Sequence, residues 1–150
     1  TGIAFSKSGT KMFIVGNDPV AGGSSADSVH EYTLTGAYCI GTATFVDSFN
    51  ISSQETSPSD VVFSKSGTKM FVIGSANPDS VYEYTLAVAW DVSSASFVDS
   101  FSVNSQEASI RDIWFDSSGK TMFIVGKSGD DVNVYKLNVA WDVSSASHVS

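Results

Sequence analysis

FSKSGTKMFVIG, which runs from Phe63 to Gly74, is the stretch of sequence that decides the fold. FSKSGTKMFIVG precedes it at 5–16 and FDSSGKTMFIVG follows it at 115–126, at offsets of 58 and 52 residues. A period in this range is typical of proteins built from repeated structural units. We therefore interpret residues 1–150 as a single repeat domain, with repeats at approximately 1–58, 59–110 and 111–150, the last of them incomplete.

Each repeat predicts four short antiparallel strands. The first two are joined by Lys-Ser-Gly-Thr, in which Gly67 supplies the positive φ that a tight hairpin needs. Continuous apolar runs predict that these two strands are covered on both faces, and Asp91 is expected to accept backbone hydrogen bonds in the turn before the fourth. In the second repeat the predicted strands are Asp60–Ser64, Lys69–Ile73, Val81–Leu86 and Phe97–Val103.

The hairpin F-S-x-x-G-x-K-M-F-V-x-G, followed by the strand V-Y-E-Y-T-L, resembles blades of β-propeller repeats related to the YVTN and WD40-like groups. The linker AWDVSSAS-FVDSFSV-SQE resembles tandem repeats of marine bacterial and phage surface proteins. This resemblance implies an all-β fold of three four-stranded antiparallel propeller-type blades, forming half of a six-bladed propeller or part of a larger one. It implies no particular activity, because propellers host many unrelated functions.

A β-trefoil is the alternative fold, since three units of four strands also satisfy its arithmetic, but it does not explain hairpins that are apolar on both faces. Propellers close with roughly four to eight blades, so three blades leave two open faces. Each face presents roughly 300 Å², and its exposure costs on the order of 7 kcal/mol. We expect a second copy, or further blades of a longer chain, to complete the ring.

Charge and composition exclude several partners. The formal net charge of -8 argues against nucleic acid and anionic membranes, which bind clustered Lys and Arg. The longest apolar run, Leu86–Trp90, is far too short to cross a membrane. The single cysteine, Cys39, excludes an intrachain disulfide. An acidic, serine-rich and cysteine-poor chain favours an extracellular or surface-associated location.

Charged residues at and before the start of the first strand form the best candidate binding site, because this strand lines the central channel of a propeller. A structural role is favoured for the repeated acids among them, which would cap loops or accept backbone hydrogen bonds. No catalytic residue is assigned, since the sequence contains neither a G-x-S-x-G nor an HExxH motif. The candidates are Glu55, Asp60, Glu107, Arg111 and Asp112.

Calcium is the one cofactor that the sequence brings into question. Aspartates precede the third strand of each repeat, but no D-x-D-x-D-G loop accompanies them, so we predict Asx-turns and no cofactor. The insertion Asn17–Ala26 is predicted to be a loop, either silent or on a binding face. The aspartates are Asp27, Asp79, Asp130 and Asp131.

The leading prediction of function is a non-enzymatic, self-associating propeller scaffold with a structural, adhesion or ligand-binding role on a cell or virion surface. Its partners would be a second copy and a glycan or protein ligand. One alternative is a propeller-type hydrolase or lactonase with a metal in the central channel. Another is a subunit of a filament or array, because a head-to-tail interface that does not close propagates.

Overall fold

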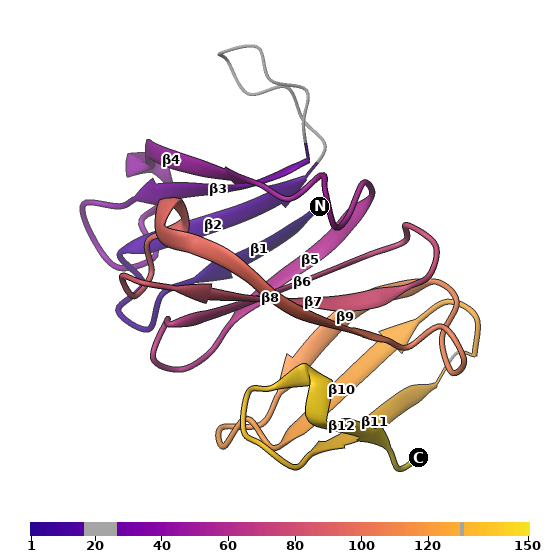
Figure 1. Cartoon of the computed structure of the whole chain (residues 1–150). Helices are drawn as coiled ribbons and strands as arrows, with labels where there is room; N and C mark the ends of the chain where they lie inside the picture. Colours follow the sequence, from indigo (N-terminus) through magenta and orange to yellow (C-terminus); the bar gives the residue numbers. More distant parts are fainter. Residues whose placement is uncertain (17–26, 130) are drawn as a thin grey trace.

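A computed structural model describes residues 1–16, 27–129 and 131–150 of the chain. They form three four-stranded antiparallel sheets, called blades 1 to 3 here, and in each sheet the strands lie in their order along the chain (Figure 1). Blade 1 contains β1 (Gly2–Phe5), β2 (Lys11–Gly16), β3 (Ser28–Thr33) and β4 (Thr44–Asn50). Blade 2 contains β5 (Pro58–Phe63), β6 (Lys69–Gly74), β7 (Ser80–Leu86) and β8 (Ala95–Ser102). Blade 3 contains β9 (Ile110–Phe115), β10 (Thr121–Gly126), β11 (Val132–Leu137) and β12 (Ala146–His148).

This arrangement confirms the all-β, propeller-type fold and excludes the β-trefoil, because the sheets are separate and stand face against face. The first strands of the blades, β1, β5 and β9, lie side by side, and the later strands extend outward from them (Figure 1). None of the described helices could cross a membrane. The insertion Asn17–Ala26 and the calcium candidate Asp130 lie outside the described residues.

Local sequence chemistry produces the hairpins and turns as predicted. The hairpin glycine has φ of 69°, 73° and 70° in the three blades, at Gly9, Gly67 and Gly119. The β7–β8 turn contains the short 3-10 helix Val92–Ser94, and the Asp91 carboxylate accepts a hydrogen bond from the backbone N–H of Ser93 at 3.0 Å. The neighbouring Trp90 has φ of 63°, which places its indole against Gly67 of the same blade.

The hydrophobic core consists of two layers, one between each pair of neighbouring blades. Phe13 and Val15 of blade 1 pack against Met70 and Val72 of blade 2, and a second cluster joins blades 2 and 3. The second strands are buried almost throughout, whereas the fourth strands are largely exposed. The second strands thus confirm the predicted burial on both faces, but the prediction is wrong for the first strands, which are only partly covered because one side of them lines a groove.

An ion pair between a buried glutamate and a partly exposed lysine connects blade 1 to blade 2. The carboxylate of Glu31, 1% exposed, pairs with Lys11 at 2.6 Å and accepts a hydrogen bond from the backbone N–H of Val92 at 3.0 Å. Lys11 also donates to the carbonyl oxygen of Trp90 at 2.7 Å. Lys11 and Glu31 of blade 1 thus bind the backbone of the β7–β8 turn of blade 2. We call this arrangement the junction clasp.

The second junction repeats the clasp. Lys69 pairs with Glu83 in blade 2, and the other carboxylate oxygen of Glu83 accepts a hydrogen bond from the N–H of Val143 at 2.9 Å. Val143 begins the 3-10 helix Val143–Ser145 in the β11–β12 turn of blade 3. The clasp is therefore a repeated feature of both junctions within the chain.

Candidate functional site

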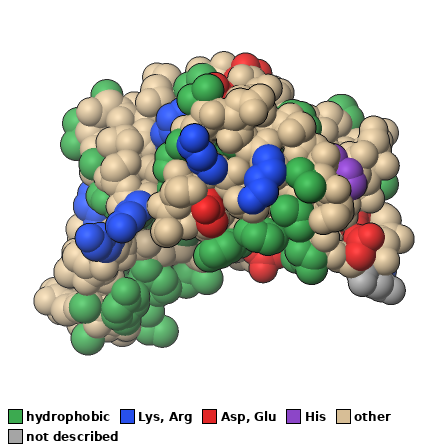
Figure 2. All heavy atoms as spheres, turned by 90° about the horizontal axis from the view of Figure 1, so that it is seen from below, with side chains coloured by type: hydrophobic (Ala, Val, Ile, Leu, Met, Phe, Trp, Pro, Cys, Tyr) green, Lys and Arg blue, Asp and Glu red, His purple; other side chains and the backbone are tan. Residues whose placement is uncertain are grey.

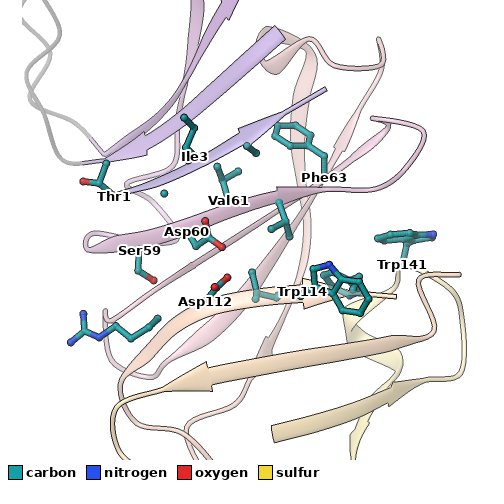
Figure 3. A pocket seen from close by; sticks show the side chains of 15 residues that line it. Thr1, Ile3, Ser59, Asp60, Val61, Phe63, Asp112, Trp114 and Trp141 are labelled. Carbon is teal, nitrogen blue, oxygen red and sulfur yellow. The ribbon is translucent and has the colours of Figure 1, made fainter. Parts of the chain in front are cut away.

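A groove of about 640 Å³ runs along the three inner strands. One end is polar, and Asp60 and Asp112 point toward one another there (Figure 3). The opposite end is aromatic, with Phe63, Trp114 and Trp141 (Figure 3). A site with a few convergent polar groups beside an apolar surface is the usual form of a small-molecule pocket.

Repeated geometry creates the carboxyl pair. Asp60 and Asp112 each stand three residues before the last phenylalanine of the inner strand, so neighbouring blades present them side by side. The corresponding residue of blade 1 is Gly2, and a Cβ there would overlap the Asp60 carboxyl group. Glycine at this position therefore leaves room for the Asp60 side chain.

Burial raises the pKa of Asp60 from 3.8 to about 7, and a hydrogen bond to the Asp112 side chain and the charge of that carboxylate add to the effect. Two carboxyl groups in contact hold one proton between them more readily than two negative charges. At neutral pH the Asp60 carboxyl, with a pKa of about 7, is therefore about half protonated, whereas an isolated aspartate would be ionised.

Because its pKa is raised in the folded protein, protonation of Asp60 favours folding below pH 3.8, and this contribution is lost as the pH rises through about 7. In the wild-type protein this makes the free energy of unfolding fall as the pH rises from about 4 to 8, and we expect a smaller fall in Asp60→Asn. Urea denaturation across this range provides the measurement. An unchanged slope in the variant would show that Asp60 titrates normally.

The predicted site residues divide into two groups. Asp60, Arg111 and Asp112 line the groove, and Arg111 donates a hydrogen bond to the Ser109 hydroxyl at 3.3 Å. Arg111 and Asp112 are exposed. These three residues are the part of the candidate set that the structure brings together.

Glu55 and Glu107 are fully buried in the linkers between blades. One oxygen of Glu55 accepts hydrogen bonds from the N–H groups of Ser57 at 2.6 Å and Ala76 at 3.1 Å. Glu107 makes the equivalent bonds to Ser109 and Ser128 at 2.7 and 3.0 Å. Both glutamates tie the linker to the loop after the second strand, as the structural interpretation of these acids expects.

The same surroundings change the pKa values of the two glutamates in opposite directions. Burial raises the pKa of Glu55 above its usual range, against the backbone hydrogen bonds. Burial also opposes ionisation of Glu107, but the hydrogen bonds from Ser128 and Ser109 outweigh it and lower its pKa. Neither group lines the groove.

Among the described residues, no three His, Cys, Asp or Glu side chains gather as a metal site. Asp79 accepts a hydrogen bond from the Ile110 N–H at 3.3 Å, and Asp131 accepts one from the Asn133 side chain at 3.0 Å. In the described groove, Asp60 and Asp112 supply two carboxylates where Ca²⁺ takes six to eight oxygens. The metal of the hydrolase alternative therefore has an incomplete ligand set in the described residues.

The aromatic end of the groove was not predicted from the sequence. Trp114, 60% exposed, occupies the position of Ala4 in blade 1 and Val62 in blade 2. The signal in the sequence was the size of Trp114, which is the one large side chain at this position when the three inner strands are aligned.

Comparison with known proteins supports the fold. A Lactobacillus plantarum protein has a TM-score of 0.66 at 14% identity, a provisional 6-phosphogluconolactonase of Bacteroides fragilis 0.67 at 9%, and the periplasmic gluconolactonase PpgL of Pseudomonas aeruginosa 0.62 at 13%. Each alignment covers 99% of this chain but 40%, 37% and 37% of the other, in the same order. No family model and no curated protein sequence matches the chain.

The fold of this chain is thus a set of propeller-like blades that do not close into a ring, and the chain spans about two-fifths of the length of these structures. At this identity the likeness establishes the fold alone. The leading prediction of a non-enzymatic scaffold is nevertheless wrong as the first choice, because two of the three neighbours bear the names of lactonases.

Proposed function

We propose that the chain is the channel-forming part of a propeller-type hydrolase that opens lactones of polyhydroxylated acids. The observation that carries the proposal is the Asp60–Asp112 pair at the polar end of the groove, with the pKa of Asp60 near 7. A group that is half protonated at neutral pH is suited to general acid–base catalysis. The names of two structural neighbours, a 6-phosphogluconolactonase and a gluconolactonase, supply the substrate class.

The carboxyl pair can perform both proton transfers of lactone hydrolysis. The ionised member accepts a proton from the water that attacks the carbonyl carbon. The protonated member donates its proton to the ring oxygen as the acyl–oxygen bond breaks. Arg111 lines the same groove and offers a guanidinium to an anionic substituent of the substrate.

Asp60→Asn is expected to lower kcat for a glucono-lactone by about 10²–10⁴-fold, the usual contribution of a positioned acid or base. Asp99→Asn is the control, because Asp99 is an exposed aspartate on the outermost strand of blade 2. Initial rates must be measured against the spontaneous hydrolysis of the lactone. A wild-type rate equal to the spontaneous rate, or equal rates for both variants, would reject the proposal.

Membership of the YVTN or WD40-like groups, or of the marine bacterial and phage repeats, stays a prediction. The extracellular or surface location, the glycan or protein ligand and the filament also stay predictions.

A further inference from the structure

The blades at the two ends of the chain each leave one apolar face open. On the outer face of blade 1, the side turned away from blade 2, Ile3, Tyr38 and Ile40 are 55–62% exposed. On the outer face of blade 3, Trp114 and Val132 are 60% and 54% exposed. Seen from below, hydrophobic side chains gather in patches at one end and along the middle of the molecule (Figure 2).

Two of these exposed residues, Ile3 and Val132, have equivalents in blade 2 that are buried. Val61 of blade 2 corresponds to Ile3, and Val81 of blade 2 corresponds to Val132. Both valines are 0% exposed, because each lies in a junction between blades. The outer faces thus have the composition of junction faces.

The outer face of blade 3 lacks the clasp. Thr121 stands where blade 2 has Lys69, and Val134 stands where blade 2 has Glu83. If a blade like blade 3 followed, the backbone N–H equivalent to that of Val143 would need a carboxylate acceptor, as Val143 finds in Glu83. Blade 3 offers no carboxylate at this position.

The turn on the outer face of blade 1 lacks the free N–H donor that the clasp uses in the other two blades. In its β3–β4 turn, the N–H of Ile40 donates to the carbonyl oxygen of Tyr38 at 2.9 Å. The equivalent N–H groups of Val92 and Val143 donate to Glu31 and Glu83 of the preceding blade. The turn of blade 1 therefore satisfies its own donor and needs no acceptor from a neighbour.

We propose that the outer face of blade 3 binds the outer face of blade 1 of a second copy, so that two chains close a six-bladed ring. The outer face of blade 3 has no carboxylate acceptor, and the turn on the outer face of blade 1 has no N–H donor that needs one. The two faces can therefore pack together without leaving a buried donor unpaired. The two new junctions bury about 1,200 Å² in all, at the lower end of stable interfaces. Six blades lie within the range in which propellers close.

Ring closure would complete the groove. At the new junction Asp112 would neighbour Gly2 of the partner subunit, so the ring would carry two Asp60–Asp112 pairs separated by glycines. Inner strands of both chains would then surround one channel, whereas a single chain provides three strands on one side of it. The partner would thus supply half of the channel wall.

Light scattering of the 150-residue chain after gel filtration tests the proposal without any ligand. At about 50 µM we expect twice the chain mass of 15.8 kDa, and Val134→Glu should raise the dissociation constant at least about 100-fold. Val139→Glu is the matched control, because Val139 is 56% exposed in the β11–β12 turn and should leave the dimer intact. Circular dichroism verifies that each variant is folded, and Val132→Lys replaces Val134→Glu if the latter is unfolded.

The proposal would be overturned if the wild-type chain is a monomer at this concentration or forms an assembly of more than two chains. It would also be overturned if Val134→Glu or Val132→Lys is folded and keeps the wild-type dissociation constant. A monomer that still hydrolyses lactones would overturn the ring alone. A dimer without activity would overturn the proposed function alone.

Discussion

Replacing Glu83 with alanine is expected to lower the free energy of unfolding by about 2–4 kcal/mol, because it removes the buried carboxylate of an ion pair whose lysine is partly exposed. Glu83 is 1% exposed, pairs with Lys69 and accepts the N–H of Val143 at 2.9 Å. Without Glu83, Val143 loses its buried acceptor, and Lys69, whose side chain is 30% exposed, loses its counter-charge. Urea denaturation monitored by circular dichroism gives the free energy.

The chain itself offers the matched variant. Lys69→Thr combined with Glu83→Val reproduces the pair Thr121 and Val134 of blade 3 and removes both charges together. We expect this double variant to lose only about 1–3 kcal/mol, the cost of one buried N–H without an acceptor. Equal losses in the single and double variants would show that the unpaired lysine charge contributes nothing.

Gly67→Ala is expected to destabilise the protein by about 2–4 kcal/mol. Gly67 has φ of 73°, which is unfavourable for any residue with a Cβ, and a Cβ there would overlap the indole ring of Trp90. The indole cannot move away freely, because the backbone N–H of Trp90 donates to the carbonyl oxygen of Gly67 at 2.9 Å and the ring packs against Phe63. Thermal and urea unfolding would both register the loss.

Gly41→Ala is the control for this substitution. Gly41 lies in the turn of blade 1, has no positive φ, and a Cβ there would meet nothing within 4 Å. We expect a change within about 0.5 kcal/mol, as for most surface substitutions. A loss as large as that of Gly67→Ala would mean that general loop stiffening, and not the Trp90 contact, determines the effect.

Sequence alone predicts the features that depend on neighbouring residues. The hairpin glycines and the turn carboxylate of Asp91 act within a few positions of themselves, so their chemistry is visible in the motif. The clasp was not predicted, because Glu31 and Val92 lie 61 residues apart and a single repeat does not reveal which turn its carboxylate meets. The signal was present, since Lys and Glu occur together in two repeats and are lost together in the third.

The candidate site was only partly predictable for a related reason. Glu55 and Asp60 lie five residues apart and both repeat in the next unit, as Glu107 and Asp112, so the sequence treats them alike. Backbone N–H groups of two separate loops surround Glu55, whereas Asp60 lies on the strand that lines the groove. Long-range hydrogen bonding distinguishes a structural acid from one available to a ligand.

The junction clasp gives the three blades a fixed order even though their sequences are nearly interchangeable. Blade 2 carries both a turn whose N–H needs an acceptor and the Glu83 that serves as one, so a duplicate of blade 2 inserted beside it would keep the clasp at every junction. A duplicate of blade 3 in the same place would strand the N–H of its successor, because Val134 accepts nothing. The middle unit therefore carries both halves of the clasp, which makes blade 2 the suitable module for building longer propellers from this chain.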